Sequence, residues 1–549
     1  MPVILEDLER RFTDLKAMRQ PWEPGWKEIT DYVLPRRSFW DLEPGQEGKK
    51  PTQKIFDGSG INALQLLVDG LQGYLISPSI RWYRLQMEDK SQQDIPGVAD
   101  WLEEVEDILY AEFARSNFYE AISEFFLDAA SIGTAAMLVE DDVTEKRILF
   151  STRHIKECYI AEARTGMVDT LYREFWMTNR QMIQMWKKEL SAERQTLARE
   201  QPFAKVKVRH CVYPRKDRQS GKADGGNKPW ASVYIDHEKK VIIDEGGYES
   251  FPYLVWRWRK NSDELYGRSP ASDAIQDILR INQVARTSLE ARQLAVQPPM
   301  NIPMEMRGME RLVPRGANYY TNPQALITPI NMASNYPAAK DQEDDIREQI
   351  KETFRTKIFL LMEQLGEQAK TATEIRERQG EKAAVLGATI GRLNSETLIP
   401  LIDRVYAICN KNGILPLPPE ALSEGGRVHI EFSGPLYQAQ KTFHQTQGVA
   451  SALGFATAMA QIMPDSIDNV DEDELMRIGL DSNGAPQKTI RELPDVQARR
   501  KKRAEAMAAQ QKAVMDLEKQ KIMGSNAEQL NKPLQPDSML AQVAAGQGG

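Results

Sequence analysis

The sequence has few of the residues that form disulfides or bind metals. Among 549 residues there are only 3 cysteines, Cys158, Cys211 and Cys409. This odd, widely spaced set gives no disulfide framework and is typical of a reducing compartment. The 5 histidines are His154, His210, His237, His429 and His444. They form no i,i+4 pair and have no cysteine at zinc spacing, so we interpret them as packing residues and expect no metal site.

A long hydrophobic run is also missing. The most apolar early stretch, "ALQLLVDGLQGYLI", is short and contains Asp69, so we expect no membrane span. The N-terminal "MPVILEDLERRF" soon becomes charged, which does not fit a signal peptide. These features predict a soluble protein that is intracellular at least when it is made.

No catalytic signature stands out. The sequence contains no G-x-x-x-x-G-K-[ST] loop, which argues against a P-loop ATPase. "GSG" is too short for a dinucleotide fingerprint, and "GRSPA" lacks the final glycine of a nucleophile elbow, so we expect Ser269 to cap a helix. The acidic clusters at 140–142, 343–345 and 471–474 lack calcium-loop spacing. We therefore expect neither enzymatic activity nor a cofactor.

The charge balance is slightly acidic. A formal net charge of −8 argues against general affinity for nucleic acid, because such affinity comes mainly from Lys and Arg neutralising phosphates. Local basic patches remain candidates for contacts with DNA or a partner; they are Arg286, Arg292, Arg307, Arg311, Arg315, Lys351 and Arg355. The run from Arg499 to Arg503 is interpreted as a solvated face or tail. A solvated helix face is the usual interpretation of such residues.

The aromatic residues divide the chain. All 10 tryptophans lie at or before Trp258, and 1–268 is predicted to contain helices followed by antiparallel strands. Within this part we expect a helix break near Ser116 and Asn117 and a hairpin turn at "RTG". A second antiparallel group is predicted from "KVKVRHCVYP", "WASVYID", "KVIIDEG" and "YLVWRWR". Thr178 and Gln181 form a capping-box pattern before it. The later part is mainly aliphatic and helical, so we expect an α+β chain that is predominantly helical.

Two long helical patterns flank an irregular insert. The first, 269–297, begins at Ser269 and Pro270 and would be about 40 Å long at ~1.5 Å per residue. The second covers 341–365 and ends at Gly366, and the insert between them, 298–340, is rich in proline.

A third long helical pattern, 373–411, follows a short link. Thr371 and Glu374 form a capping-box pattern at its start, and Pro400 should bend it. Residues 412–496 supply one strand and a helix of small residues. Residues 497–549 are predicted to form a charged helix that fades into disorder.

In its wording and order, the sequence resembles the portal proteins (head-to-tail connectors) of short-tailed bacteriophages. The stretches that carry the resemblance are "FDGSGINALQLLVDGLQGYLISPSIRWYRL", "LYREFWMT", "DELYGRSPASDAIQDI" and "TATEIRERQGEKAAVLGATIGRLNSETLIPLIDRV". They span about residues 50 to 410. The tail after about 500 has no recognisable counterpart.

The resemblance implies a ring, usually of twelve subunits, at one vertex of the capsid. Such a ring conducts double-stranded DNA without sequence specificity during packaging and ejection, and docks the terminase and then tail adaptor proteins. Major capsid and scaffolding proteins are further implied partners. The implied location is the virion, with assembly in the host cytoplasm. Twelve copies at −8 each would give a ring charge of about −96, which repels phosphates and limits non-specific binding to DNA.

The resemblance also implies a role for each segment. Residues 1–268 would form the wing, 269–297 and 341–365 the stem, 298–340 the clip, and 366–372 a tunnel loop facing DNA. Residues 373–411 would form a kinked wing helix and 412–496 a C-terminal wing or crown. The implied loop residues are Gly366, Glu367, Gln368, Ala369, Lys370, Thr371 and Ala372, with Lys370 nearest the DNA.

Two other interpretations remain open. A packaging nuclease or ATPase would need metal-dependent cleavage or nucleotide turnover, and the missing phosphate loop argues against the ATPase. A helical scaffold or tail adaptor would bind only other virion proteins. Changes in 366–372 would alter packaging in a portal but have no effect in an adaptor.

Overall fold

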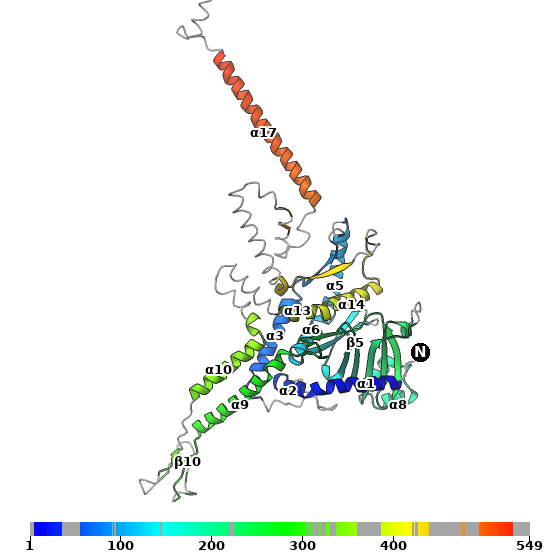
Figure 1. Ribbon diagram of the computed structural model, residues 1–549, viewed down its shortest axis with the longest axis vertical. Helices are drawn as coiled ribbons and strands as arrows, with labels where there is room; N and C mark the ends of the chain where they lie inside the picture. Colours follow the sequence, from blue (N-terminus) through cyan, green and yellow to red (C-terminus); the bar gives the residue numbers. More distant parts are fainter. Residues whose placement is uncertain are drawn as a thin grey trace, which may run out of the picture. The chain divides into compact units, whose positions relative to one another are not determined.

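The computed structural model (Figure 1) describes residues 5–35, 55–89, 92, 95–142, 145, 147–218, 224–304, 307–308, 310, 318–319, 326–329, 336–359, 386–419, 422, 427–438, 471, 473, 476–477 and 493–530. The chain divides into two compact units, Met1–Gly454 and Phe455–Gly549. The first unit contains a body of helices and sheets together with two long helices. The second unit contains helix α17 (Leu493–Leu530).

A five-stranded antiparallel sheet forms one part of the body, in the order β4-β5-β6-β7-β8. Its strands are β4 (Cys158–Glu162), β5 (Val168–Thr178), β6 (Lys205–Pro214), β7 (Trp230–Asp236) and β8 (Val241–Tyr248). Side chains alternate between the two faces of a strand. Val233 therefore packs with helix α1 (Leu5–Arg19), whereas Tyr234 packs with α7 (Asn179–Trp186) on the opposite face.

Local signals in this sheet are confirmed. Thr178 and Gln181 form the predicted capping box of α7. The predicted turn "RTG" joins β4 to β5, and its Gly166 has a φ of 81°, a value that glycine adopts without steric cost. A second short helix, α8 (Ala192–Glu200), begins at the N-cap Ser191.

A three-stranded sheet in the order β3-β2-β9 forms the centre of the body. The strands are β2 (Thr134–Asp142), β3 (Arg147–Arg153) and β9 (Tyr253–Arg257). The sequence grouped β9 with the strands that precede it in the chain, and this grouping is wrong. β9 pairs with β2. β4 and β5 belong to the same sheet as β6, β7 and β8. Order along the chain does not predict such pairings, because β9 returns across the body to reach β2.

Several helices share a large apolar core with one face of this sheet. They are α2 (Glu23–Val33), α3 (Ser59–Leu75), α5 (Val98–Arg115) and α6 (Phe118–Ile132). The predicted break at Ser116 and Asn117 is confirmed by the end of α5 and the start of α6. A two-stranded antiparallel sheet joins β1 (Tyr83–Met87) to β12 (Val428–Phe432).

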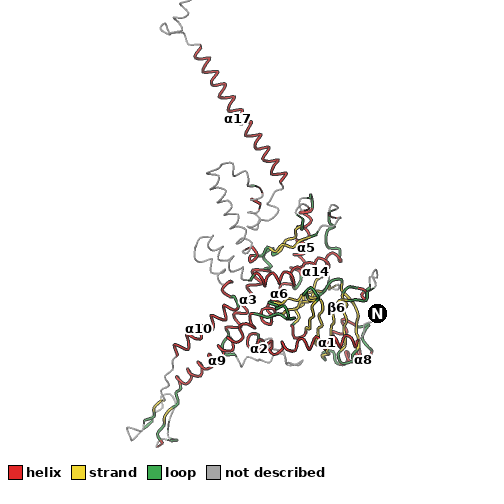
Figure 2. The backbone as a smooth tube through the Cα atoms, in the orientation of Figure 1, coloured by secondary structure: helices red, strands yellow, loops and turns green. Residues whose placement is uncertain are grey.

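Two long helices pack side by side (Figure 2). Helix α9 (Pro270–Val296) begins, as predicted, with Ser269 as its N-cap. Its partner is α10 (Tyr336–Thr353). The short strands β10 (Met300–Asn301) and β11 (Thr328–Pro329) pair in the segment between them.

Helix α10 differs from the predicted helix over 341–365. It begins at Tyr336, and it is interrupted after Thr353 by a turn in which Arg355 has a φ of 57°. Helical residues follow at 356–359, where this described range ends. An unbroken helix would point Phe354 and Phe359 about 140° apart, whereas the turn buries both in the same core. The predicted end at Gly366 lies outside the described residues.

The third long helix contains an irregular turn. Helix α13 (Gly387–Leu393) continues through the π-helical turn η6 (Asn394–Leu398) into α14 (Ile399–Lys411). Pro400 has no backbone N–H that could donate to the carbonyl of Glu396. The π-helical turn, with its wider hydrogen-bonding pattern, lies directly before this proline. The predicted Thr371–Glu374 cap and the predicted start of this helix at 373 lie outside the described residues. No helix among the described residues has the length and apolar character needed to cross a membrane.

Candidate functional site

The two long helices are anchored at one end and exposed toward the other. Ala271, Ile275 and Ile278 of α9 are buried in the main core. Farther along the same helix, Leu289 is 44% exposed and Val296 is 80% exposed. These two residues are seven positions apart and therefore lie on one face of the helix. The outer half of α9 thus presents apolar side chains that the described residues leave exposed.

A small polar junction fixes α9 and α10 to the start of α3. Asn282 of α9 accepts hydrogen bonds from the backbone N–H groups of Phe56 (2.8 Å) and Asp57 (3.2 Å). The Asp57 carboxylate in turn accepts a 3.0 Å hydrogen bond from Arg347 of α10. Burial raises the pKa of Asp57, but hydrogen bonds from Ser59 and Arg347 outweigh it, so the pKa lies below its usual value. One segment therefore joins both long helices.

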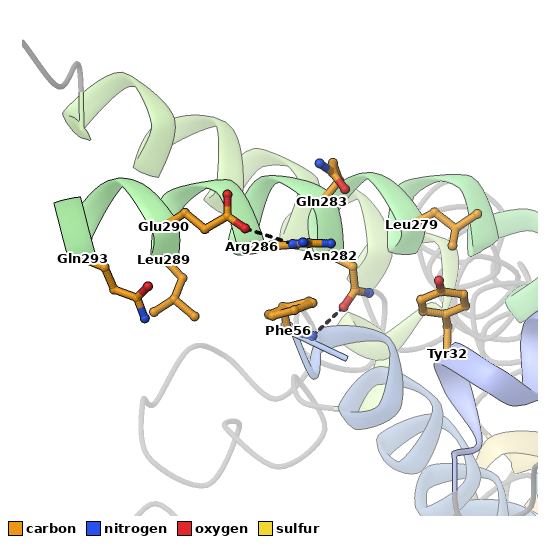
Figure 3. A pocket seen from close by; sticks show the side chains of 9 residues that line it. All are labelled: Tyr32, Phe56, Leu279, Asn282, Gln283, Arg286, Leu289, Glu290 and Gln293. Atoms are coloured by element: carbon orange, nitrogen blue, oxygen red, sulfur yellow. Dashed lines mark hydrogen bonds and ion pairs between the residues drawn. The ribbon is translucent and has the colours of Figure 1, made fainter. Parts of the chain in front are cut away.

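A groove runs along α9 next to this junction (Figure 3). Its lining residues are Tyr32, Phe56, Leu279, Asn282, Gln283, Arg286, Leu289, Glu290 and Gln293. The Arg286 guanidinium lies 5.8 Å from the centre of the Phe56 ring and 3.0 Å from the Glu290 carboxylate. The groove is therefore partly apolar, and its one pair of opposite charges is satisfied within α9.

The predicted basic candidates do not form one cluster in the described residues. Arg286 pairs with Glu290, and Lys351 lies 3.6 Å from Glu348. The exposed candidates on α9, on the segment after it and at the turn after α10 are Arg292, Arg307 and Arg355. Arg311, Arg315 and the loop residues 366–372 lie outside the described residues. The long helices thus balance much of their positive charge locally.

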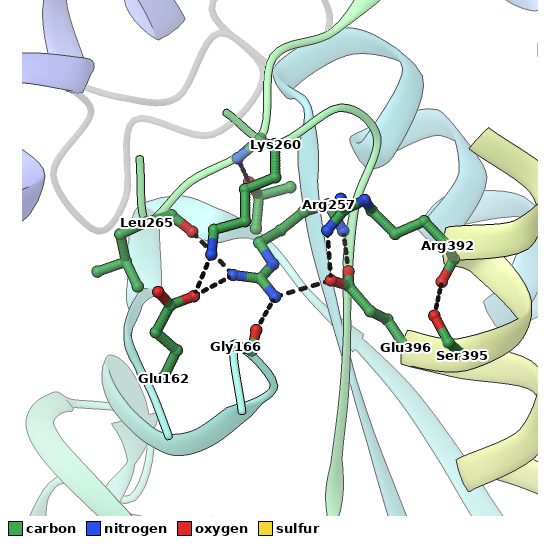
Figure 4. A network of polar contacts seen from close by, with 10 residues as sticks. Glu162, Gly166, Arg257, Lys260, Leu265, Arg392, Ser395 and Glu396 are labelled. Atoms are coloured by element: carbon green, nitrogen blue, oxygen red, sulfur yellow. Dashed lines mark hydrogen bonds and ion pairs between the residues drawn. The ribbon is translucent and has the colours of Figure 1, made fainter. Parts of the chain in front are cut away.

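Sequence reasoning missed a buried polar network that holds η6 against the sheets (Figure 4). Arg257, at the end of β9, lies between two carboxylates and is fully buried. It donates to Glu162 and to Glu396 of η6, each at 2.7 Å. Arg392 also donates to Glu396, at 3.0 Å. The sequence feature that could have revealed this network is Arg257 within the apolar run "YLVWRWR", because a buried charge requires a partner.

The residues with possible catalytic interpretations have structural roles. The Ser269 hydroxyl accepts a hydrogen bond from the N–H of Ser272 (2.9 Å) and donates to the Ser131 carbonyl (2.6 Å). Burial lowers the pKa of His210 to about 3, and its ring nitrogens are bonded to Tyr253 and Ser232. In the described ranges, His, Cys, Asp and Glu form no group of three that could hold a metal ion.

Comparison with known proteins identifies the class. The family of bacteriophage head to tail connecting proteins matches residues 5–490. A probable portal protein of Bordetella phage BPP-1 is 31% identical over 515 residues, 92% of each chain. The portal protein of Salmonella phage epsilon15 is 29% identical over 530 residues, which cover 92% of this chain and 94% of the relative. The chain therefore belongs to the bacteriophage head to tail connecting protein family.

This membership confirms the resemblance found in the sequence and assigns a structural role rather than an enzymatic one. The mixed helix and sheet architecture agrees with it. Among solved structures, a chain from the neck of an empty GTA particle is similar over 82% of this chain and 99% of its own length. Its sequence identity of 11% and TM-score of 0.34 are too low to support an argument about the fold.

Proposed function

We propose that this protein forms a portal ring at one capsid vertex and conducts double-stranded DNA during packaging and ejection. The ring, usually of twelve subunits in this family, docks the terminase and then tail adaptor proteins, and it contacts the major capsid and scaffolding proteins. The body forms the wing, and α9 and α10 form the stem. The segment between these helices, which includes β10 and β11, forms the clip.

The exposed apolar face of α9 carries this proposal. Leu289 and Val296 remain accessible although the inner half of the same helix is buried. A ring with heterologous interfaces needs such a face on every subunit, because each subunit covers its neighbour. The polar junction of Asn282, Asp57 and Arg347 supports the proposal, because it fixes the direction in which both helices leave the body.

The channel assignment rests on the loop 366–372. We place Lys370 nearest the DNA, where twelve copies would form a ring of positive charge that biases the position of DNA at modest cost. Arg292, Arg307, Arg311, Arg315 and Arg355 are further candidates for contacts with DNA or docking proteins. Arg286 and Lys351 are weaker candidates, because carboxylates of their own helices lie close to them.

Negative-stain microscopy of the purified chain tests the ring. The wild-type chain should form rings, and Leu289→Asp should abolish them, because it places a charge on the proposed subunit interface. Met185→Asp is the matched control: Met185 is 55% exposed on α7, and its variant should assemble normally. A wild-type chain that remains a monomer or dimer at high concentration in several salts would overturn the ring.

A packaging assay tests the channel. Lys370→Ala and deletion of 367–371 should leave assembly intact but alter the amount of DNA packaged. Lys188→Ala, which removes an exposed charge on the body, is the control and should package normally. Normal packaging by both loop variants would contradict the channel assignment and favour a scaffold or tail adaptor that binds only other virion proteins.

A further inference from the structure

Helix α17 carries an unusual concentration of positive charge. The five consecutive residues "RRKKR", Arg499 to Arg503, are all exposed. No acidic residue lies between Asp495 and Glu505. Like charges three or four positions apart on a helix destabilise it by roughly 0.2–0.5 kcal/mol per pair. The like-charge pairs within the run therefore oppose helix stability, and Asp495 and Glu505 offset this repulsion only at its two ends.

Within the described residues, the same run forms fewer ion pairs than the basic residues of the long helices. On α10, the cations are balanced by nearby acids, as in the pairs Arg347–Asp344 and Lys351–Glu348. Within the described part of the second unit, Arg500 is the one member of the run that forms an ion pair. It bonds to both carboxylate oxygens of Asp473, at 2.8 and 2.5 Å.

The distribution of these charges around the helix indicates the kind of partner. Successive residues of an α-helix are about 100° apart, so five in a row surround the whole helix. A folded protein partner would contact only one side of such a band. The major groove of a duplex admits an α-helix between two phosphate backbones and can therefore satisfy cations on more than one side. Arginine also binds phosphate oxygens in a bidentate manner.

The composition of α17 also favours double-stranded over single-stranded nucleic acid as the partner. Residues 493–530 contain no aromatic side chain and no histidine. Proteins that hold single strands without sequence preference usually stack the bases on aromatic rings. A helix with dense positive charge and no stacking surface therefore suits the sugar-phosphate backbone of a duplex.

We propose that the segment Arg499 to Arg503 is a second DNA-binding site, which contacts the phosphate backbone of double-stranded DNA without reading its sequence. The site lies in the second compact unit and is separate in the chain from the loop 366–372. The biological role of this site rests on the proposed portal function. The binding itself requires only the basic run.

Fluorescence anisotropy of a labelled random-sequence duplex, titrated with the full-length chain over a salt series, tests this site. The variant Lys501→Gln/Lys502→Gln/Arg503→Gln removes three cations but keeps the Arg500–Asp473 pair. The control Lys512→Gln/Lys519→Gln/Lys521→Gln removes the same charge from the same helix. Circular dichroism should show wild-type helicity in both. Lys501→Arg/Lys502→Arg, which keeps the charge, should bind like the wild type.

The run variant should bind at least about tenfold more weakly at ~0.1 M salt, and its slope of log affinity against log salt should shrink by about two to three. The control should lose less than about threefold. Equal losses in both variants, or no loss in either, would overturn the site. Normal DNA binding combined with lost subunit assembly would identify an acidic protein surface as the partner and overturn it too.

Microscopy of the same preparations separates this proposal from the portal ring. If the wild-type chain forms no rings while the run variant shows the expected loss of DNA affinity, the result would contradict the ring and leave the basic site intact. Normal rings with unchanged DNA affinity in the run variant would overturn the basic site alone.

Discussion

The buried network of the body and the exposed pair on the outer part of α9 handle charge in opposite ways. In the body, Arg257 is fully buried and held between Glu162 and Glu396. On α9, Arg286 and Glu290 form a pair that is more than half exposed. A buried pair needs both partners because water cannot replace either one. An exposed pair contributes little, since each ion is already solvated.

This difference teaches where the chain tolerates change. The network around Arg257 connects β9 to η6, and therefore fixes the third long helix to the sheets. The exposed pairs on α9 and α10 leave these helices free to gain or lose charges as their partners require. The body is thus the rigid reference, and the long helices are the adaptable surface.

The largest expected effect is the loss of the buried network. Arg257→Met should lower the free energy of unfolding by about 3–5 kcal/mol, because the buried Glu396 keeps the backbone N–H of residue 257 but has only Arg392 as a charged partner. Urea unfolding followed by tryptophan fluorescence, at one fixed protein concentration, measures this change. The double variant Arg257→Met/Glu396→Leu should recover much of the loss, since it removes both buried charges. A single-variant cost below ~1 kcal/mol would contradict the network's role.

A second buried carboxylate should make stability depend on pH. Burial raises the pKa of Glu106 from 4.5 to about 7. The folded protein therefore binds this proton more tightly than the unfolded chain, and the stabilisation present below pH ~4.5 is lost as the pH rises through about 7. Relative to Glu106→Gln, the wild type should lose on the order of 3 kcal/mol between these limits.

Thermal unfolding over a pH series of both proteins checks this dependence. Glu290→Gln on the exposed face of α9 is the control, and its pH profile should follow that of the wild type. A Glu106→Gln variant with an unchanged profile would show that another group controls the dependence.

The junction between the two regions should have an intermediate effect. Asn282→Ala leaves the N–H groups of Phe56 and Asp57 without their acceptor, which should cost about 1–3 kcal/mol. Gln283→Ala, the neighbouring exposed position on α9, should cost less than ~0.5 kcal/mol. Urea unfolding of both variants makes the comparison, and equal costs would contradict the proposed anchoring of α9.

The smallest effect is expected for the exposed pair itself. A double-mutant cycle with Arg286→Ala and Glu290→Ala should give a coupling energy of about 0.3–0.5 kcal/mol that falls with added salt. A coupling above ~2 kcal/mol would remove the distinction between the two regions.

Local features of the fold could be predicted from the sequence because their causes lie a few residues apart. The Ser269 cap, the Thr178–Gln181 capping box and the "RTG" turn each depend on adjacent side chains and backbone. The exposed basic helix after 497 follows equally from its composition. The resemblance to the family could also be recognised from the sequence, because it rests on the order of several long sequence stretches along the chain.

Other features depend on contacts between distant parts of the chain. The pairing of β9 with β2, and that of Arg257 with Glu396, joins residues whose proximity only the folded body creates. The end of α10 was missed for a similar reason. Its apolar pattern continues through Phe354, and the turn at Arg355 serves the packing of Phe359 against α3. Gly70 of α3 makes this contact possible, because a Cβ there would lie 2.3 Å from the Phe359 ring.

The pairing of β1 with β12 also bears on how the protein is made. The ribosome synthesises Met87 long before Val428, and at roughly 5–20 residues per second the interval is on the order of tens of seconds. During this time, β1 has no partner, and the apolar residues Tyr83, Leu85 and Met87 cannot be fully enclosed. Unpaired strands of this kind are prone to aggregate. Chaperone binding to the nascent chain, up to the moment when β12 emerges, would protect the first unit while it is incomplete.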